Sequence, residues 1–203
     1  MTKRIHTEFV EIASGISVDL HHAISRTKPL RLKKRNDRPL PEVLCRAVAG
    51  QQLSTQAAST IWGRVVERAG SQSLIEHIAA TKQEELRACG LSNAKAKAMK
   101  AIAEADHHGR LDITSLAEAS HVERSEVLTE IWGIGQWTAD MISIFYFGEK
   151  DVWPDKDVTV WKTLERLTGK RRKTLLTAAR FAPNRSHLAV YMYHFADVGI
   201  PTK

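Results

Sequence analysis

The sequence predicts an all-α protein, and three observations carry this prediction. Apolar residues recur at helical spacing along most of the 203 residues. The alternation typical of a half-buried strand is nearly absent. Residues that favour helix ends stand between the periodic stretches. These stretches cover about residues 8–26, 41–50, 54–69, 73–80, 82–89, 93–107, 123–131, 136–147, 157–168, 172–180 and 185–197.

The first stretch breaks near Gly15, and the segment 28–38 that follows it is the chief linker of the chain. This linker is strongly basic and contains Arg31, Lys33, Lys34, Arg35 and Arg38. Runs of like charge are usually solvated, so we favour a flexible connector. The alternative is an arm that contacts phosphates.

The later stretches have recognisable ends. Gly70 and Gly169 stand at predicted C-termini, where glycine readily adopts the conformation that ends a helix. Thr81 and Asn93 are suited to be N-caps. Pro183 separates the last two helices, because proline cannot continue a preceding helix.

Charge and cysteine content narrow the classes of protein. A formal net charge of +7 and a pI near 9.5 favour polyanionic partners, whose binding weakens with salt. Cys45 and Cys89 lie in apolar helical patterns, so we expect buried, reduced thiols and no four-cysteine iron–sulfur cluster. No signal-peptide core or membrane-length apolar run is present, so we expect a cytoplasmic, nucleoid-associated protein.

The most informative segment covers residues 131–139 and contains Gly133 and Gly135 on either side of one apolar residue. Such glycines permit a tight turn and close approach of the backbone to a ligand. A helix that begins near Gln136 would point its free N–H groups the same way, which suits a DNA phosphate. Taken alone, the two glycines favour an ordinary helix end. The stretch 136–147 is nearly all apolar or small, which suits a helix buried on most sides. We therefore expect this helix to hold the turn rigidly in place.

Four segments then point in one direction. They are Ala47-Val48-Ala49-Gly50-Gln51-Gln52-Leu53-Ser54, Cys89-Gly90-Leu91-Ser92 with Lys95-Ala96, Trp132-Gly133-Ile134-Gly135 with Thr138-Ala139, and Pro183-Asn184-Arg185-Ser186. Together they resemble the helix-hairpin-helix DNA glycosylase superfamily, and within it the bacterial 3-methyladenine DNA glycosylases of the type II class. Trp132 stands where the family's hairpin usually has proline. The matches run from about residue 41 to about residue 195.

The resemblance implies an architecture and an activity. The fold would have two helical lobes, about 41–150 and about 1–40 with 151–203, and an active-site cleft between them. The activity would be that of a DNA glycosylase in base excision repair, which removes alkylated purines such as 3-methyladenine. The partner would be double-stranded DNA with damaged bases. The protein would act as a monomer and would not bind a membrane.

The resemblance also implies a catalytic carboxylate. Asp157 directly precedes the apolar segment 158–161, as the family's essential aspartate does, whereas Asp155 matches less well. Hydrolysis of an N-glycosidic bond passes through an oxocarbenium-like sugar, which a carboxylate stabilises while it orients or deprotonates water. An alkylated purine is cationic and leaves readily, so a second carboxylate is not required. Alternatively, Asp157 only caps its helix, or does both.

The residue before Thr138 predicts the type of reaction. Lyase members of the superfamily have a lysine there, which attacks the sugar as an amine, whereas this chain has Trp137. We therefore expect a monofunctional enzyme that leaves an abasic site in an uncut strand. An indole face attracts a cationic ring, so we expect Trp137 to hold the flipped base.

Two further walls of the base pocket follow from the resemblance. Tyr193 and Trp153 lie at or near positions where the similar enzymes place aromatic residues, although core packing is the alternative for each. Trp161, Trp62 and Tyr191 are better suited to the core.

The DNA contacts are also taken from the resemblance. Gln52 matches the side chain that fills the gap left by an extruded nucleotide, with helix capping as the alternative. The hairpin residues expected to contact DNA are Gly133, Ile134, Gly135 and Thr138. Backbone carbonyls of Ile131, Trp132 and Ile134 can hold K⁺ or Na⁺ in this superfamily's manner, and no other cofactor is required. The histidines lack the spacing of a transition-metal site.

Three functions remain open at this point. The first is a monofunctional glycosylase for alkylated bases. The second is a glycosylase for deaminated or mismatched bases, and the third is a non-catalytic helix-hairpin-helix DNA-binding protein. Asp157 and Trp137 argue against the third.

Overall fold

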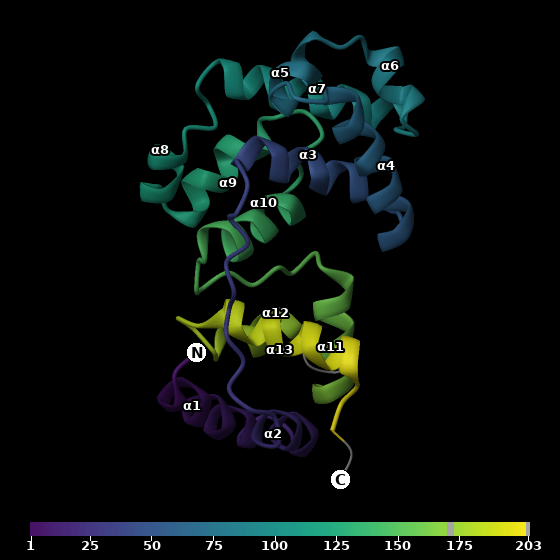
Figure 1. The fold of residues 1–203 in the computed structure, drawn as a ribbon. Coiled ribbons are helices and arrows are strands. Elements are labelled where there is room, and N and C mark those ends of the chain that lie inside the picture. The colour runs from purple at the N-terminus through teal and green to yellow at the C-terminus, as the bar shows by residue number, and fades with distance from the viewer. Residues whose placement is uncertain (170–172, 202–203) are drawn as a thin grey trace. The chain divides into compact units, whose positions relative to one another are not determined.

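The computed structural model describes residues 1–169 and 173–201, and within them it contains only helices and loops (Figure 1). The predicted all-α class is confirmed. No helix among these residues is long and apolar enough to cross a membrane. The elements are α1 (Lys3–Ser14), α2 (Val18–Ser25), α3 (Leu40–Gly50), α4 (Thr55–Ala69), α5 (Leu74–Ala80), α6 (Gln83–Ala88), α7 (Asn93–His107), α8 (Ile113–Glu118), α9 (His121–Thr129), α10 (Gln136–Ile142), the π-helix η1 (Ser143–Phe147), α11 (Val158–Thr168), α12 (Thr174–Ala179) and α13 (Arg185–Val198).

The chain divides into two compact units. The split unit joins Met1–Lys34 to Ser143–Lys203, and the continuous unit is Arg35–Ile142. The sequence placed these boundaries at about residues 41 and 150. The second boundary falls where α10 gives way to η1. Gly148, just after η1, packs so closely on the Lys34 side chain that a Cβ at this position would collide with it. The residues after η1 therefore lie in the same unit as Lys34.

The core of the split unit forms where α1 and α2 cover α11–α13 (Figure 1). The expected break near Gly15 separates two helices, because Ser17 caps α2 and its hydroxyl also donates to the Leu167 carbonyl at the end of α11 (2.7 Å). The apolar core contains Phe9, Ala13, Ile16, Leu20, Ala23, Ile24, Trp153, Val160, Leu164, Leu167, Ala178, Phe181, Leu188, Ala189, Tyr191, Met192 and Phe195. This core supports the N-terminus of α11.

Helix α7 is the central element of the continuous unit, where it packs against α3, α5 and α6 (Figure 1). Its inward face is small and apolar, which lets the neighbouring helices approach closely. Its buried residues are Ala96, Ala98, Met99, Ile102, Ala103 and Ala105. The Lys100 ammonium donates to the Thr81 carbonyl at the end of α5 (2.9 Å). α7 therefore ties together three helices that precede it in the sequence.

Several helix ends differ from the predictions. Thr81 is the C-cap of α5, not an N-cap, and Ser92 rather than Asn93 caps α7. α8 was not predicted, because its short apolar pattern resembles a loop; it begins after Asp112, whose carboxylate accepts from the Ser115 N–H (2.8 Å). The stretch predicted at 172–180 corresponds to α12, and its first residue lies outside the described residues.

Candidate active site

Asp157 lies at the N-cap of α11, in a buried position where its side chain is 7% exposed. Its Oδ1 accepts a hydrogen bond from the Val160 N–H (3.0 Å), so the capping role is real. Capping uses one carboxylate oxygen and leaves the other to act elsewhere. An acidic group here also complements the positive end of the helix dipole.

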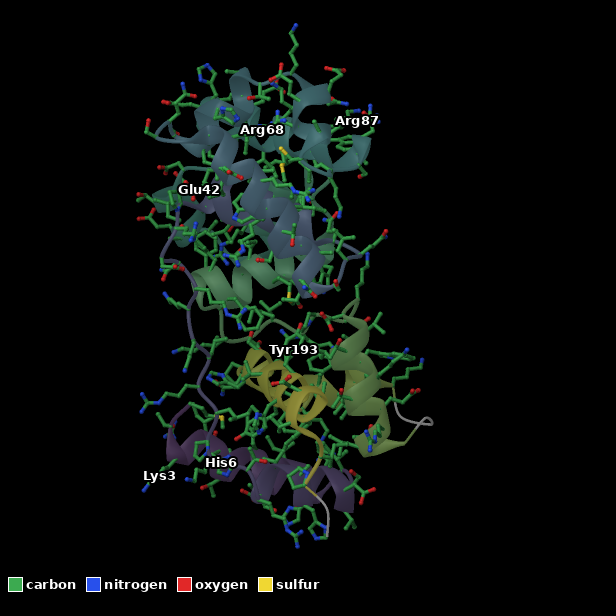
Figure 2. All side chains as sticks on the ribbon, turned by 45° about the vertical axis from the view of Figure 1, so that its right-hand side comes forward. Lys3, His6, Glu42, Arg68, Arg87 and Tyr193 are labelled. Atoms are coloured by element: carbon green, nitrogen blue, oxygen red, sulfur yellow. The ribbon has the colours of Figure 1, made fainter. Side chains whose placement is uncertain are left out.

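The second oxygen of Asp157 accepts from Tyr193. The hydroxyl of this half-buried tyrosine, on α13, donates to Asp157 Oδ2 at 2.9 Å (Figure 2). The Tyr193 ring lies 6.0 Å from the ring of Phe145, with the two planes tilted by 52°. Each oxygen of the predicted catalytic carboxylate therefore has a donor in the protein.

The loop before Asp157 is fastened to the start of α13. The Arg185 guanidinium makes two hydrogen bonds to the Asp151 carboxylate, from Nε (2.7 Å) and from Nη2 (3.0 Å), and the Arg185 backbone N–H makes a third (3.2 Å). Burial raises the pKa of Asp151, but the hydrogen bonds to Arg185 outweigh burial and leave that pKa below its ordinary value. The Val152 N–H donates to Ser186 Oγ (3.0 Å), and the Ser186 N–H donates to the Lys150 carbonyl (2.9 Å). The Arg-Ser pair in the sequence thus has a structural role that sequence reasoning missed.

The hairpin between α9 and α10 is packed on α7. Gly133 has a φ of +91°, and a Cβ on it would collide with Ala98 of α7. The Ile134 N–H donates to the Ile131 carbonyl (3.0 Å), which closes the turn. Ile134 and Thr138 are buried, so their side chains back the turn. Only glycine fits at position 133.

Trp132 occupies the position where similar hairpins have proline, and it is exposed. The Lys97 ammonium of α7 lies 4.3 Å from the centre of its ring, a cation–π contact. A basic group is therefore held beside the hairpin glycines. The sequence offered no signal for this pair, because the two residues are far apart along the chain.

The start of α10 is fixed by a buried carboxylate. Asp140, in the second turn of α10, is 5% exposed and accepts from the Gln136 side-chain amide (2.8 Å). The His121 Nε2 of α9 lies 3.4 Å from the same oxygen. These contacts hold α10 against α9 on either side of the hairpin. Sequence reasoning did not identify Asp140.

Gln52 lies in the turn between α3 and α4, where it is exposed and has a φ of +57°. The turn is held by Lys95, whose ammonium donates to the carbonyls of Ala49 (3.0 Å) and Gln51 (2.7 Å). Burial lowers the pKa of Lys95. Leu53, next to Gln52, is also exposed. Two of the segments quoted in the sequence, 47–54 and 89–96, are thus joined by one side chain.

The tryptophans divide into exposed and buried residues. Trp137, on α10, is 39% exposed, whereas Trp153 is buried in the split unit's core, and its indole N–H has no hydrogen-bond partner among the described residues. Trp62 is buried as expected. Trp161 is 38% exposed, so the expectation that it lies in the core was wrong. It lies on the outward face of α11, where Val158 is exposed too.

The cysteines and the other ligand-type residues form no metal site in the described part of the chain, where no group of three or more His, Cys, Asp or Glu residues is placed to hold an ion. Cys45 and Cys89 are buried and unpaired with each other, and burial raises the pKa of Cys45 far above its ordinary value. Cys45 is therefore protonated and unreactive at neutral pH.

Comparison with known proteins gives consistent results. The chain is 36% identical over 170 residues to DNA-3-methyladenine glycosylase 1 of Schizosaccharomyces pombe, an alignment that covers 80% of this chain and 75% of that protein. The structure of the S. pombe 3-methyladenine DNA glycosylase with abasic DNA is 30% identical, with a TM-score of 0.77 over 97% of this chain and 100% of that one. A DNA-3-methyladenine glycosidase from Bacillus halodurans is 29% identical, with a TM-score of 0.79 over 94% of this chain and 88% of that one. Residues 45–181 match the HhH-GPD superfamily of base excision DNA repair proteins, and the chain therefore belongs to this family.

Proposed function

We propose that this protein is a DNA glycosylase that hydrolyses the N-glycosidic bond of alkylated purines such as 3-methyladenine during base excision repair. The observation that carries the proposal is the buried Asp157 carboxylate, held by the Val160 N–H and the Tyr193 hydroxyl in a chain of this family. The relatives named as 3-methyladenine DNA glycosylases support the choice of substrate.

Asp157 would act on the sugar. As the bond to the base lengthens, positive charge develops on the deoxyribose, and a fixed carboxylate stabilises that charge without having to reorganise. The same group orients the attacking water and accepts its proton. Because Asp157 is buried, its field is weakened less by solvent than that of an exposed carboxylate. One carboxylate is sufficient for a base that leaves as a neutral molecule from a cationic nucleotide.

Trp137 would bind the extruded base. Its indole is exposed and can stack on a purine, and a positive charge on that purine strengthens the contact by about 0.5–2 kcal/mol. The same position gives no amine for attack on the sugar, so we propose hydrolysis without strand cleavage. A borohydride-trapped covalent adduct with DNA would contradict this part of the proposal.

The hairpin and Gln52 would bind the DNA itself. Gly133 and Gly135 leave the backbone of the turn open to a phosphate, while the exposed Gln52 would fill the space of the flipped nucleotide. The carbonyls of Ile131, Trp132 and Ile134 offer oxygen donors only, a set that fits K⁺ or Na⁺. Ile131 already accepts one hydrogen bond, and its second lone pair suffices for an ion. The positive charge of such an ion would attract a DNA phosphate.

The test is release of free base from methylated duplex DNA. Wild-type protein should release 3-methyladenine and 7-methylguanine, and Asp157→Asn should reduce the single-turnover rate by about 100-fold or more. The matched control is Asp155→Asn, because Asp155 is exposed and lies in the same loop. Full activity of Asp157→Asn would refute the catalytic assignment.

The substrate class is decided by a panel of lesions in the same assay. Excision of only neutral deaminated or mismatched bases would favour the second candidate function and contradict a cation-selective pocket. Tight binding with no excision of any lesion would identify a non-catalytic DNA-binding protein.

A further inference from the structure

We propose that Tyr193 is a positioning residue for the reaction: its hydroxyl fixes the orientation of the Asp157 carboxylate toward the sugar. This inference rests on the proposed glycosylase function and assigns Tyr193 a role other than that of a wall beside the base.

Donors from α11 and α13 hold the Asp157 carboxylate. The Val160 N–H holds Oδ1 at 3.0 Å, and the Tyr193 hydroxyl holds Oδ2 at 2.9 Å. With one donor on each oxygen, rotation of the carboxylate about its bond to Cβ is opposed from both sides. The carboxylate is therefore held in one orientation by donors from two different helices.

Tyr191 and Tyr193, both on α13, have different hydrogen-bond partners. Its neighbour Tyr191 points into the core, where its hydroxyl lies 2.7 Å from His6 Nδ1 on α1. Figure 2 places Tyr193 on the side of α13 that faces away from α1 and His6. The half-buried Tyr193 hydroxyl instead donates to the Asp157 carboxylate at the start of α11.

The contact between Asp157 and Tyr193 depends on the packing of helices. Asp157 and Tyr193 lie 36 residues apart, on α11 and α13, and these two helices pack directly on each other. The Arg185–Asp151 pair and the Ser186 bonds fasten the loop before Asp157 to the beginning of the same α13. Helix α13 therefore holds the loop before Asp157, and through the Tyr193 hydroxyl it also holds the Asp157 carboxylate.

The experiment removes only the hydroxyl. Tyr193→Phe keeps the ring beside Phe145, so any role in packing or in stacking on the base is retained. We expect the single-turnover rate of 3-methyladenine release to fall by about 10- to 100-fold, because misplacement of a catalytic group by about 1 Å can cost about 100-fold. Binding to a duplex with an abasic site should change by less than about threefold. Tyr191→Phe is the matched control: it loses a hydroxyl on the same helix and should keep the wild-type rate.

A double-mutant cycle shows whether Tyr193 acts through Asp157. In the Asp157→Asn background the further change Tyr193→Phe should leave the residual rate the same, since there is no carboxylate left to position. An equal loss in both backgrounds would overturn the inference, as would a wild-type rate for Tyr193→Phe, or a loss of binding as large as the loss of rate. If wild-type protein releases no base from any duplex, the proposed function fails, and this inference fails with it; if wild type is active, the comparison concerns Tyr193 alone.

Discussion

The hydrogen bonds that Asp157 accepts from Val160 and Tyr193 arise at different levels of structure. The bond from Val160 follows from local helix geometry, because an aspartate before an apolar helix is a strong N-cap pattern. The bond from Tyr193 depends on how α11 packs on α13, which no local pattern specifies. The sequence therefore predicted both residues of the pair but not their contact.

The pair Asp151 and Arg185 was not predicted as a site feature at all. Each residue type is common on protein surfaces, and only the folded chain brings the guanidinium to the carboxylate. Trp132 and Lys97 are a similar case, since their contact requires the hairpin to lie on α7. Long-range pairs of this kind need tertiary structure for their recognition.

The buried His187 should make the stability of the protein depend on pH. It is buried in α13, and burial, with smaller contributions from the N-terminal amine and Lys150, lowers the pKa of His187 from 6.5 to about 4. The neutral form of His187 is therefore favoured in the folded state. Its contribution to the free energy of unfolding is complete above about pH 6.5 and is lost as the pH falls toward 4. We expect the free energy of unfolding to drop by about 2 kcal/mol between pH 7 and pH 5 from this residue alone.

Urea titrations of wild type and His187→Leu at both pH values measure this effect. Leucine packs in a similar volume and cannot take up a proton, so the variant should show a smaller loss between the two pH values. His107→Leu, a change at an exposed histidine, is the control. Equal losses in wild type and His187→Leu would contradict the assignment.

At the scale of the elements, strong periodicity was sufficient for the long helices. α3, α4 and α7 lie within a residue or two of their predicted ranges, because each buries a regular apolar face and has clear end signals. α8 was not predicted, because an apolar pattern over six residues is too short to indicate a helix. The stretch 136–147 was predicted as one helix, whereas the chain changes from α10 to the π-helix η1 at Ser143, a change without a sequence signal.

The hairpin gives a prediction that separates its two glycines. Gly133→Ala should reduce the free energy of unfolding by about 1–3 kcal/mol, because a Cβ would collide with Ala98 and the residue would keep a strained positive φ. Gly135→Ala should fold normally, since φ there is not positive and a Cβ meets no atom within 4 Å.

Thermal or urea unfolding of both variants, with DNA affinity measured alongside, checks this expectation. Gly135→Ala should weaken binding to an abasic-site duplex without a loss of stability, because its new methyl group occupies the space for a phosphate. If the two variants unfold alike, the close packing of the turn on α7 is not a determinant of stability.

At the scale of the whole molecule, the two units differ in how the chain builds them. The continuous unit, Arg35–Ile142, uses one unbroken segment. Expressed alone, it should fold cooperatively, as measured by circular dichroism on heating, because its core residues all lie within it. Its core includes Leu44, Val48, Val65, Ile78, Met99, Ile102 and Leu128.

The fragment 143–203 should not fold alone, because the core of the split unit takes Phe9, Leu20 and Ile24 from α1 and α2. Addition of a peptide of residues 1–34 should restore its helical signal. Cooperative unfolding of 143–203 without this peptide would show that the first two helices are dispensable.

The division of the split unit between the two ends of the chain also sets the order in which a ribosome can complete the protein. Helices α1 and α2 are synthesised well before the core residues that they cover on α11–α13. In the interval the continuous unit, with the hairpin and Gln52, can already fold, since domains generally fold as units during synthesis. Asp157 meets Tyr193 only after α13 has left the exit tunnel. The nascent chain therefore acquires the turns proposed to contact DNA before the proposed catalytic carboxylate is in place.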